Sequence, residues 1–176
     1  FNYVDRSVLF AVLPLIQKEF PHPNLFGMGL DGSYGFLTTA FFVCYMVTAP
    51  FIGRLADRYP RKWIMFGGAL IWCAMTLLTA VTNSFTTLLI RHTIVGLGEA
   101  TFVTVAPSFL ADLYSEEHRG RVFGWFYLNI GLGTAVGYMM GGYLGHHYGW
   151  RFPFYVAAIP GALLALALAA LPEPPR

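Results

Sequence analysis

Four charged residues lie inside apolar stretches of the sequence: Asp5, Arg6, Arg91 and Glu99. Each costs about 2.5–3.5 kcal/mol at the centre of a bilayer on insertion scales. On one helix, Arg91 and Glu99 are separated by ~12 Å along the axis, so they cannot pair directly. Because two acids and two bases sum to zero, we expect a neutral polar cluster between the first and the fourth apolar segments.

Such a cluster is suited to proton exchange. Burial favours the protonated form of a carboxylate, whereas a neighbouring cation favours the charged form. A helix movement that carries the arginine away lets the acid take a proton, which is what a proton-driven carrier requires. The small residues beside Glu99, namely Gly96, Gly98 and Ala100, are expected to leave space for a substrate. The alternative is that the charges only lock two helices together.

The composition indicates that lipid is the solvent of this chain. Of its 176 residues 56% are hydrophobic and only 11% are charged, whereas a soluble domain carries about 25% charged residues. A membrane helix needs about 20 apolar residues, and the sequence predicts an all-α bundle of six such helices. Their expected ranges are about 1–17, 34–52, 63–81, 86–113, 122–145 and 152–171. The apolar pattern already runs at Phe1, so we expect a piece of a longer protein.

The short loops carry the positive charge unevenly. The loop at 53–62, "GRLADRYPRK", and the loop with Arg119 and Arg121 are basic, and the other loops are poor in basic residues. Since basic loops stay on the cytoplasmic side, we expect both of these loops and both chain ends to be cytoplasmic. The expected location is a multi-pass protein of the plasma (inner) membrane.

The 53–62 loop also predicts a gate. Four cations are enough for topology, and the acid at Asp57 is not needed for it. Near the cytoplasmic end of the fourth segment, Asp112 is expected to accept an arginine from this loop. The predicted gate residues are Gly53, Asp57, Arg58, Arg61, Lys62 and Asp112.

Glycines recur every four residues in the fifth segment, at Gly133, Gly137, Gly141 and Gly145. This spacing puts one smooth stripe on a helix, and small residues let membrane helices approach closely. We therefore predict a packing face there, with sliding or hinging as a further possibility. The two cysteines, Cys44 and Cys73, are expected to be reduced thiols, and no metal site is expected.

These residues resemble those of a known family. "GRLADRYPRK" resembles the signature loop of the major facilitator superfamily, G-x-L-A-D-R-x-G-R-K, with Pro60 in place of its last glycine. Within that superfamily the chain looks like the spinster branch. The pieces that carry this likeness are "NYVDRSVLFAVLPLIQKEF", "RHTIVGLGEATFVTVAPSFLADLY" and "PEPPR".

The resemblance implies the N-terminal half of a twelve-helix transporter, with the C-terminal half as its missing partner. It implies a carrier of lysolipids or sphingolipids that works by alternating access. It also implies that Asp5, Arg6, Arg91 and Glu99 serve proton coupling. The fifth segment resembles the glycine-rich signature of exporters but lacks its usual proline.

Three functional interpretations stay open at this stage. The first is the proton-coupled carrier of an amphiphile. The second is a symporter of organic anions or sugar acids, since those also begin with "NY-x-DR". The third is a non-transporting scaffold or receptor. We expect no enzyme activity, because G-x-S-x-G, H-E-x-x-H and a phosphate loop are absent from the sequence. The expected partners are membrane lipid and a small amphiphilic or anionic substrate, without nucleic acid and with protons in place of a cofactor.

Overall fold

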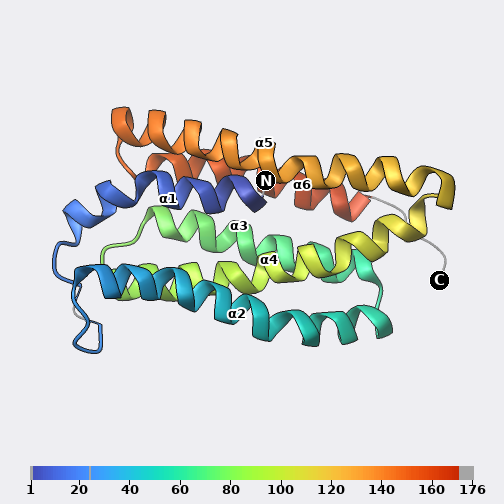
Figure 1. Ribbon diagram of the computed structural model, residues 1–176, viewed down its shortest axis with the longest axis horizontal. Helices are drawn as coiled ribbons and strands as arrows, with labels where there is room; N and C mark the ends of the chain where they lie inside the picture. Colours follow the sequence, from blue (N-terminus) through green and yellow to red (C-terminus); the bar gives the residue numbers. More distant parts are fainter. Residues whose placement is uncertain (1, 24, 171–176) are drawn as a thin grey trace.

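The structure, a computed structural model, describes residues 2–23 and 25–170. Its helices run side by side as a bundle (Figure 1). They are α1 (Asn2–Glu19), α2 (Leu30–Arg58), α3 (Arg61–Ala80), α4 (Phe85–Leu113), α5 (Glu116–Tyr148) and α6 (Phe152–Ala170). The described residues contain no strand beyond one isolated bridge between Leu25 and Met28. The predicted all-α bundle of six helices is therefore confirmed.

Several helices extend beyond the apolar stretches that predicted them. The second helix spans Leu30–Arg58 where 34–52 was expected, and the fifth spans Glu116–Tyr148 where 122–145 was expected. The additional turns carry charged residues such as Asp31 and Glu116, which favour a helix N-terminus because its dipole is positive there. The first and last expected spans include Phe1 and residue 171, which lie outside the described residues, as does the closing "PEPPR".

By length and composition, α2, α3, α4 and α6 are able to cross a membrane, and α1 and α5 are not among the helices that meet this measure. The short α1 carries Asp5 in its first turn and Lys18 in its last. In α5, the first turn is acidic and glycines replace larger apolar residues. Both helices nevertheless lie within the same bundle as the four apolar ones (Figure 1).

The bundle is built from close helix pairs. The helix α1 packs along α5, α2 packs along α4, and α3 packs against both α4 and α6. The predicted glycine stripe of α5 faces α1: a Cβ added at Gly141 would lie 2.8 Å from the Ala11 Cβ, and one at Gly145 would lie 2.8 Å from Val12 Cγ1. The stripe is therefore a packing face, and its partner is α1.

The α1–α5 contact predicts a sharp difference between two neighbouring glycines. A Cβ at Gly137 would overlap the Val4 carbonyl oxygen and lie 2.7 Å from the Ser7 Cβ, whereas Gly142 has open space beside it. We expect Gly137→Ala to destabilise the full-length protein by about 1–3 kcal/mol, the usual cost of overpacking. Thermal unfolding in detergent measures this, and Gly142→Ala is the matched control. Equal melting temperatures for the two variants would contradict the α1–α5 packing.

Candidate functional site

An ion pair joins α1 to α4 in the middle of the bundle. The Arg6 guanidinium Nη2 lies 2.5 Å from Oε2 of Glu99. Glu99 is fully buried, with 0% of its side chain exposed, and Arg6 is 18% exposed. Since an unpaired buried charge is strongly destabilising, this pair fixes how α1 faces α4.

Aromatic rings surround the Arg6 guanidinium. Its Cζ atom lies 4.9 Å from the ring centre of Phe41 and 5.5 Å from that of Phe42, both on α2. The rings of Tyr3 and Tyr45 lie at 5.2 Å and 5.9 Å. Cations within about 6 Å of aromatic faces are attracted by the ring quadrupole. The cation is thus held by a carboxylate and flanked by four aromatic rings.

The second acid, Asp5, is held from α3. The indole Nε1–H of Trp72 donates a hydrogen bond to Oδ2 of Asp5, and both residues are buried. Among the described residues, Oδ1 of Asp5 and Oε1 of Glu99 have no hydrogen-bond partner. Each acid therefore presents one buried oxygen that is available to bind a proton.

Arg91, one of the four charged residues predicted for this cluster, lies elsewhere. Arg91 donates to the Leu78 carbonyl and, at 2.8 Å, to Oγ1 of Thr82. It therefore caps the C-terminal end of α3, where unpaired carbonyl groups and the helix dipole favour a cation. The expectation that Arg91 belongs to the buried cluster was wrong, because Arg91 lies a little over two helical turns from Glu99 on α4 and its side chain reaches the end of α3 instead.

This correction changes the charge balance. The cluster at the centre of the bundle holds Asp5, Glu99 and a single arginine, Arg6. Its charge is −1 when both acids are ionised and zero when one of them carries a proton. The cluster therefore becomes electrically neutral when it binds one proton.

The space expected beside Glu99 is also not there. A Cβ added at Gly96 would lie 2.7 Å from the Phe41 carbonyl oxygen, and one at Gly98 would lie 2.7 Å from that of Gly68. These glycines let α2 and α3 approach α4 closely, so they close the site instead of opening it. The expectation of open space was wrong because small residues in a packed bundle let neighbouring helices approach closely.

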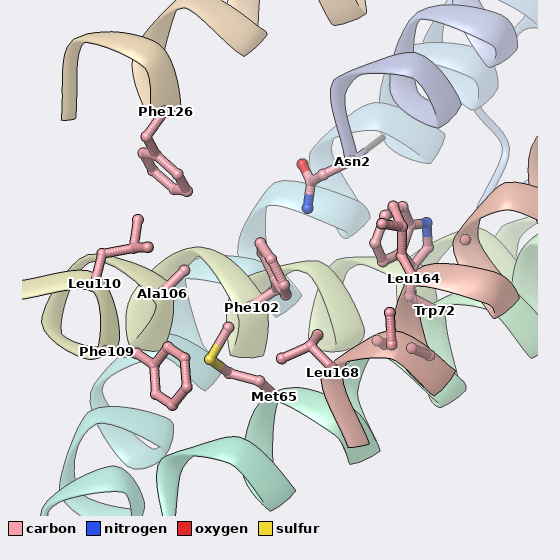
Figure 2. Close-up of a pocket in the computed structure, with 14 residues that line it drawn as sticks. Asn2, Met65, Trp72, Phe102, Ala106, Phe109, Leu110, Phe126, Leu164 and Leu168 are labelled. Carbon is pink, nitrogen blue, oxygen red and sulfur yellow. The ribbon is translucent and has the colours of Figure 1, made fainter. Parts of the chain in front are cut away.

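Open space lies at another part of the bundle. A cavity of about 340 Å³ is bounded by α3, α4 and α6, with Phe126 of α5 at its edge. Its walls are almost entirely apolar, and Trp72 lines it (Figure 2). The amide of Asn2 points into it, and neither amide atom has a hydrogen-bond partner among the described residues (Figure 2).

The predicted gate loop forms one of its expected contacts. Arg61, at the start of α3, donates to Asp112 at the end of α4. Lys62 donates to the Ala169 carbonyl at 3.3 Å and so links α3 to α6. A Cβ added at Gly53 would lie 3.9 Å from the Thr104 side chain, which leaves room for it. Asp57 and Arg58 are exposed at the end of α2.

A network at the opposite end of the bundle was missed from the sequence. Arg151 donates to both carboxylate oxygens of Glu19, at 2.6 and 2.7 Å, and to the Thr82 carbonyl at 2.7 Å. The indole of Trp150 donates to the same carboxylate at 2.6 Å. The network links α1, the α3–α4 loop and the α5–α6 loop. The sequence gives no signal for this pairing, because Glu19 and Arg151 lie 132 residues apart.

The remaining candidate ligands are dispersed. Cys44 and Cys73 are both free thiols. Among residues 2–23 and 25–170, no group of three or more His, Cys, Asp or Glu side chains is placed to hold a metal ion.

Comparisons with known proteins agree with this geometry. The family model "Major Facilitator Superfamily" matches residues 1–176. "Protein spinster" of Drosophila melanogaster is 34% identical over 176 residues, which cover 99% of this chain and 28% of that protein. The "Sphingosine-1-phosphate transporter SPNS2" of Danio rerio is 37% identical over 154 residues, which cover 85% of this chain and 29% of that protein.

A solved structure matches the fold over nearly the whole chain. The crystal structure of a bacterial homolog to the human lysosomal transporter spinster, inward-facing and unoccupied, has a TM-score of 0.87 and 27% identity. The match covers 99% of this chain and 41% of that one. The present chain thus spans less than half of the solved structure and less than a third of the two curated relatives named above.

The Glu19 network predicts a pH-dependent stability. The Arg151 hydrogen bonds hold the pKa of the Glu19 carboxyl, at the end of α1 beyond the apolar stretch, below its ordinary value of 4.5. A lowered folded-state pKa means that the contribution is complete above the unfolded pKa and is lost as pH falls through the folded one. We expect Glu19→Gln to lower the melting temperature at pH 7, and the difference from wild type to shrink below about pH 4.5.

Melting temperatures of the full-length protein measured from about pH 3 to about pH 8 test this expectation, because this range includes the pH at which carboxylates titrate. The exposed Glu117 supplies the control substitution, Glu117→Gln. A Glu19→Gln deficit that stays constant down to the lowest pH would argue against an ionic role for Glu19.

Proposed function

Because this chain belongs to the major facilitator superfamily, and within it to the spinster family, we propose that it forms the N-terminal half of a proton-coupled carrier. The chain is part of an integral membrane transporter. The carrier moves a lysolipid or sphingolipid-like amphiphile by alternating access, together with a C-terminal half of six further helices. Its coupling ion is the proton, and it uses no other cofactor.

The observation that carries the proposal is the buried Arg6–Glu99 pair with Asp5 beside it. Two acids and one arginine form a site that is neutral only when one proton is bound. A group of this kind inside apolar helices is costly, so a functional role is the default interpretation. A scaffold or receptor has no use for it.

Coupling follows from the same contact. When Glu99 takes a proton, its Coulomb attraction to Arg6 is lost and the guanidinium is free to bind an anion instead. The helix α1 is then no longer tied to α4 by charge, so the bundle can change its packing against the other half. When the proton leaves, the Arg6–Glu99 pair forms again.

Two features support an amphiphilic substrate. The Arg6 side chain is 18% exposed, and its buried Nε has no hydrogen-bond partner among the described residues. Guanidinium groups suit phosphate because their planar donors match its oxygens. The aromatic rings around Arg6 offer apolar surface to an alkyl chain. The name of the Danio rerio relative, a sphingosine-1-phosphate transporter, agrees with a substrate that has both a phosphate group and an alkyl chain.

The proposed location is the plasma (inner) membrane, with residues 53–62, at the end of α2 and the start of α3, and both chain ends on the cytoplasmic side. The basic residues of this segment, Arg54, Arg58, Arg61 and Lys62, support this orientation. The Arg61–Asp112 contact then acts as a cytoplasmic gate that closes when the carrier faces outward. The Glu19–Arg151 network lies at the outer end.

A substitution at Glu99 tests the proposal directly. In proteoliposomes of the full-length protein, we expect Glu99→Gln to abolish uptake of labelled sphingosine 1-phosphate driven by a proton gradient. Exchange of the same lipid without a gradient should survive, because the amide keeps the shape of the side chain but cannot release a proton. Glu117→Gln is the control, and competition by a lysolipid but not by a hexuronate separates the carrier from an organic-anion symporter. Normal gradient-driven uptake by Glu99→Gln would sink the proposal.

The gate predicts a conformational shift. Asp112→Asn removes the ionic partner of Arg61 and should favour the inward-open state, with little change in the affinity for substrate. Distances between spin labels on the cytoplasmic ends of the two halves measure this shift in the full-length protein. Glu117→Gln again serves as the control, and an unchanged distance distribution would rule out a gate at Asp112.

A further inference from the structure

Trp72, in the middle of α3, touches the elements that carry both buried acids. Its indole Nε1–H donates to Oδ2 of Asp5 on α1. Only 4% of the residue is exposed, and its ring forms part of the wall of the 340 Å³ cavity (Figure 2). Its hydrogen bond joins α3 to α1 next to Arg6, the residue that follows Asp5.

The backbone of Trp72 is fixed against the turn of α4 that carries Glu99. A Cβ added at Gly98 would lie 2.7 Å from the Trp72 Cβ and 2.8 Å from its backbone nitrogen. The glycine next to Glu99 therefore lets Trp72 sit directly against α4. The backbone of Trp72 is thus positioned by α4, and its indole holds Asp5.

The indole of Trp72 differs from the Arg6 guanidinium in that it carries no charge. It is a donor only, so it neither binds nor releases a proton at neutral pH. If Asp5 takes a proton on its unpartnered Oδ1, Oδ2 becomes the carbonyl oxygen and still accepts from the indole. The Trp72–Asp5 contact therefore persists in both protonation states, whereas the Arg6–Glu99 attraction does not.

We propose that Trp72 is a positioning residue for the proton-coupling site: it holds Asp5 through Oδ2, directs protonation to Oδ1, and keeps Arg6 in register with Glu99. This inference rests on the proposed proton-coupled carrier. Trp72 itself touches neither the proton nor the substrate. Its effect on transport passes through Asp5.

Other titratable groups lie near Asp5, and a test of Trp72 must distinguish their effects from that of Asp5. The charge of Asp5 interacts with Glu99 on α4 and with Cys73, the neighbour of Trp72 on α3. A variant of Trp72 that acted through Cys73 or Glu99 would keep its effect when Asp5 is removed, which gives the test its logic.

The first test is a double-mutant cycle in proteoliposomes of the full-length carrier, with labelled sphingosine 1-phosphate as probe. We expect Trp72→Phe to lower the gradient-driven turnover about tenfold with little change in KM, the loss typical of one hydrogen bond to a charged group. Asp5→Asn with Trp72→Phe should be no slower than Asp5→Asn alone. Trp63→Phe, at an exposed tryptophan of the same helix, is the control.

Wild-type turnover in Trp72→Phe would overturn the proposal. So would an effect of Trp72→Phe that adds in full to that of Asp5→Asn, because Trp72 would then act elsewhere. A normal Glu99→Gln variant together with a coupled Trp72–Asp5 pair would instead mean that the proposed function fails while the contact holds.

The second test needs no change at Trp72 and no transport. In the full-length protein labelled with fluorotryptophan, one ¹⁹F resonance should shift with pH, because protonation of Asp5 changes the acceptor of the indole. Asp5→Asn should abolish this shift, and Glu117→Gln should leave it in place. Persistence of every pH-dependent tryptophan shift in Asp5→Asn would overturn the inference, even if Trp72→Phe did not fold.

Discussion

The buried carboxylate of Glu99 is the constraint around which the bundle is organised. Removing the partner of a buried charge typically costs about 3–5 kcal/mol, so the Arg6 guanidinium must stay within reach whenever Glu99 is ionised. That requirement fixes the rotation of α1 about its axis and its register along α4. The glycine stripe of α5 follows from it, because α1 can take this position only if α5 lets its backbone approach closely. The packing of α4 on α2 and α3 serves the same end by excluding water from the pair.

The number of charges in the site explains why it is suited to a proton. A site with two acids and two bases would already be neutral with both acids ionised, so binding a proton would give it a net charge of +1. With Arg91 bound to the end of α3, the site has one acid too many for its cation. When Glu99 is ionised it ties Arg6 of α1 to α4, and when Glu99 carries the proton Asp5 retains the remaining negative charge of the cluster. In the proposed carrier, this contact links helix movement to protonation.

The sequence predicted the features that depend on composition and on periodicity along one chain. The six helices, the glycine stripe at Gly133 to Gly145 and the Arg61–Asp112 contact follow from such patterns. It did not predict features that depend on the lateral neighbours of a helix. The partner of Arg91 is a backbone carbonyl, which leaves no trace in the sequence, and a buried tryptophan such as Trp72 looks like any other core residue. Gly96 and Gly98 were misread for the same reason: glycine permits either a space or a close contact, and only the neighbouring helix decides between them.

Three ion pairs along the bundle, Arg61–Asp112, Arg151–Glu19 and Arg6–Glu99, differ in how easily each can be broken. The Arg61–Asp112 pair is partly exposed, and exposed ion pairs contribute only about 0–1 kcal/mol, so thermal motion is enough to open it. Glu19 accepts three hydrogen bonds while Arg151 also holds the Thr82 carbonyl, so opening that end requires several bonds to break together. The Arg6–Glu99 pair is too deeply buried to open spontaneously, but a proton can neutralise it. The two ends therefore differ in how readily they open, and the central pair can be released by a proton, as the proposed alternating-access carrier requires.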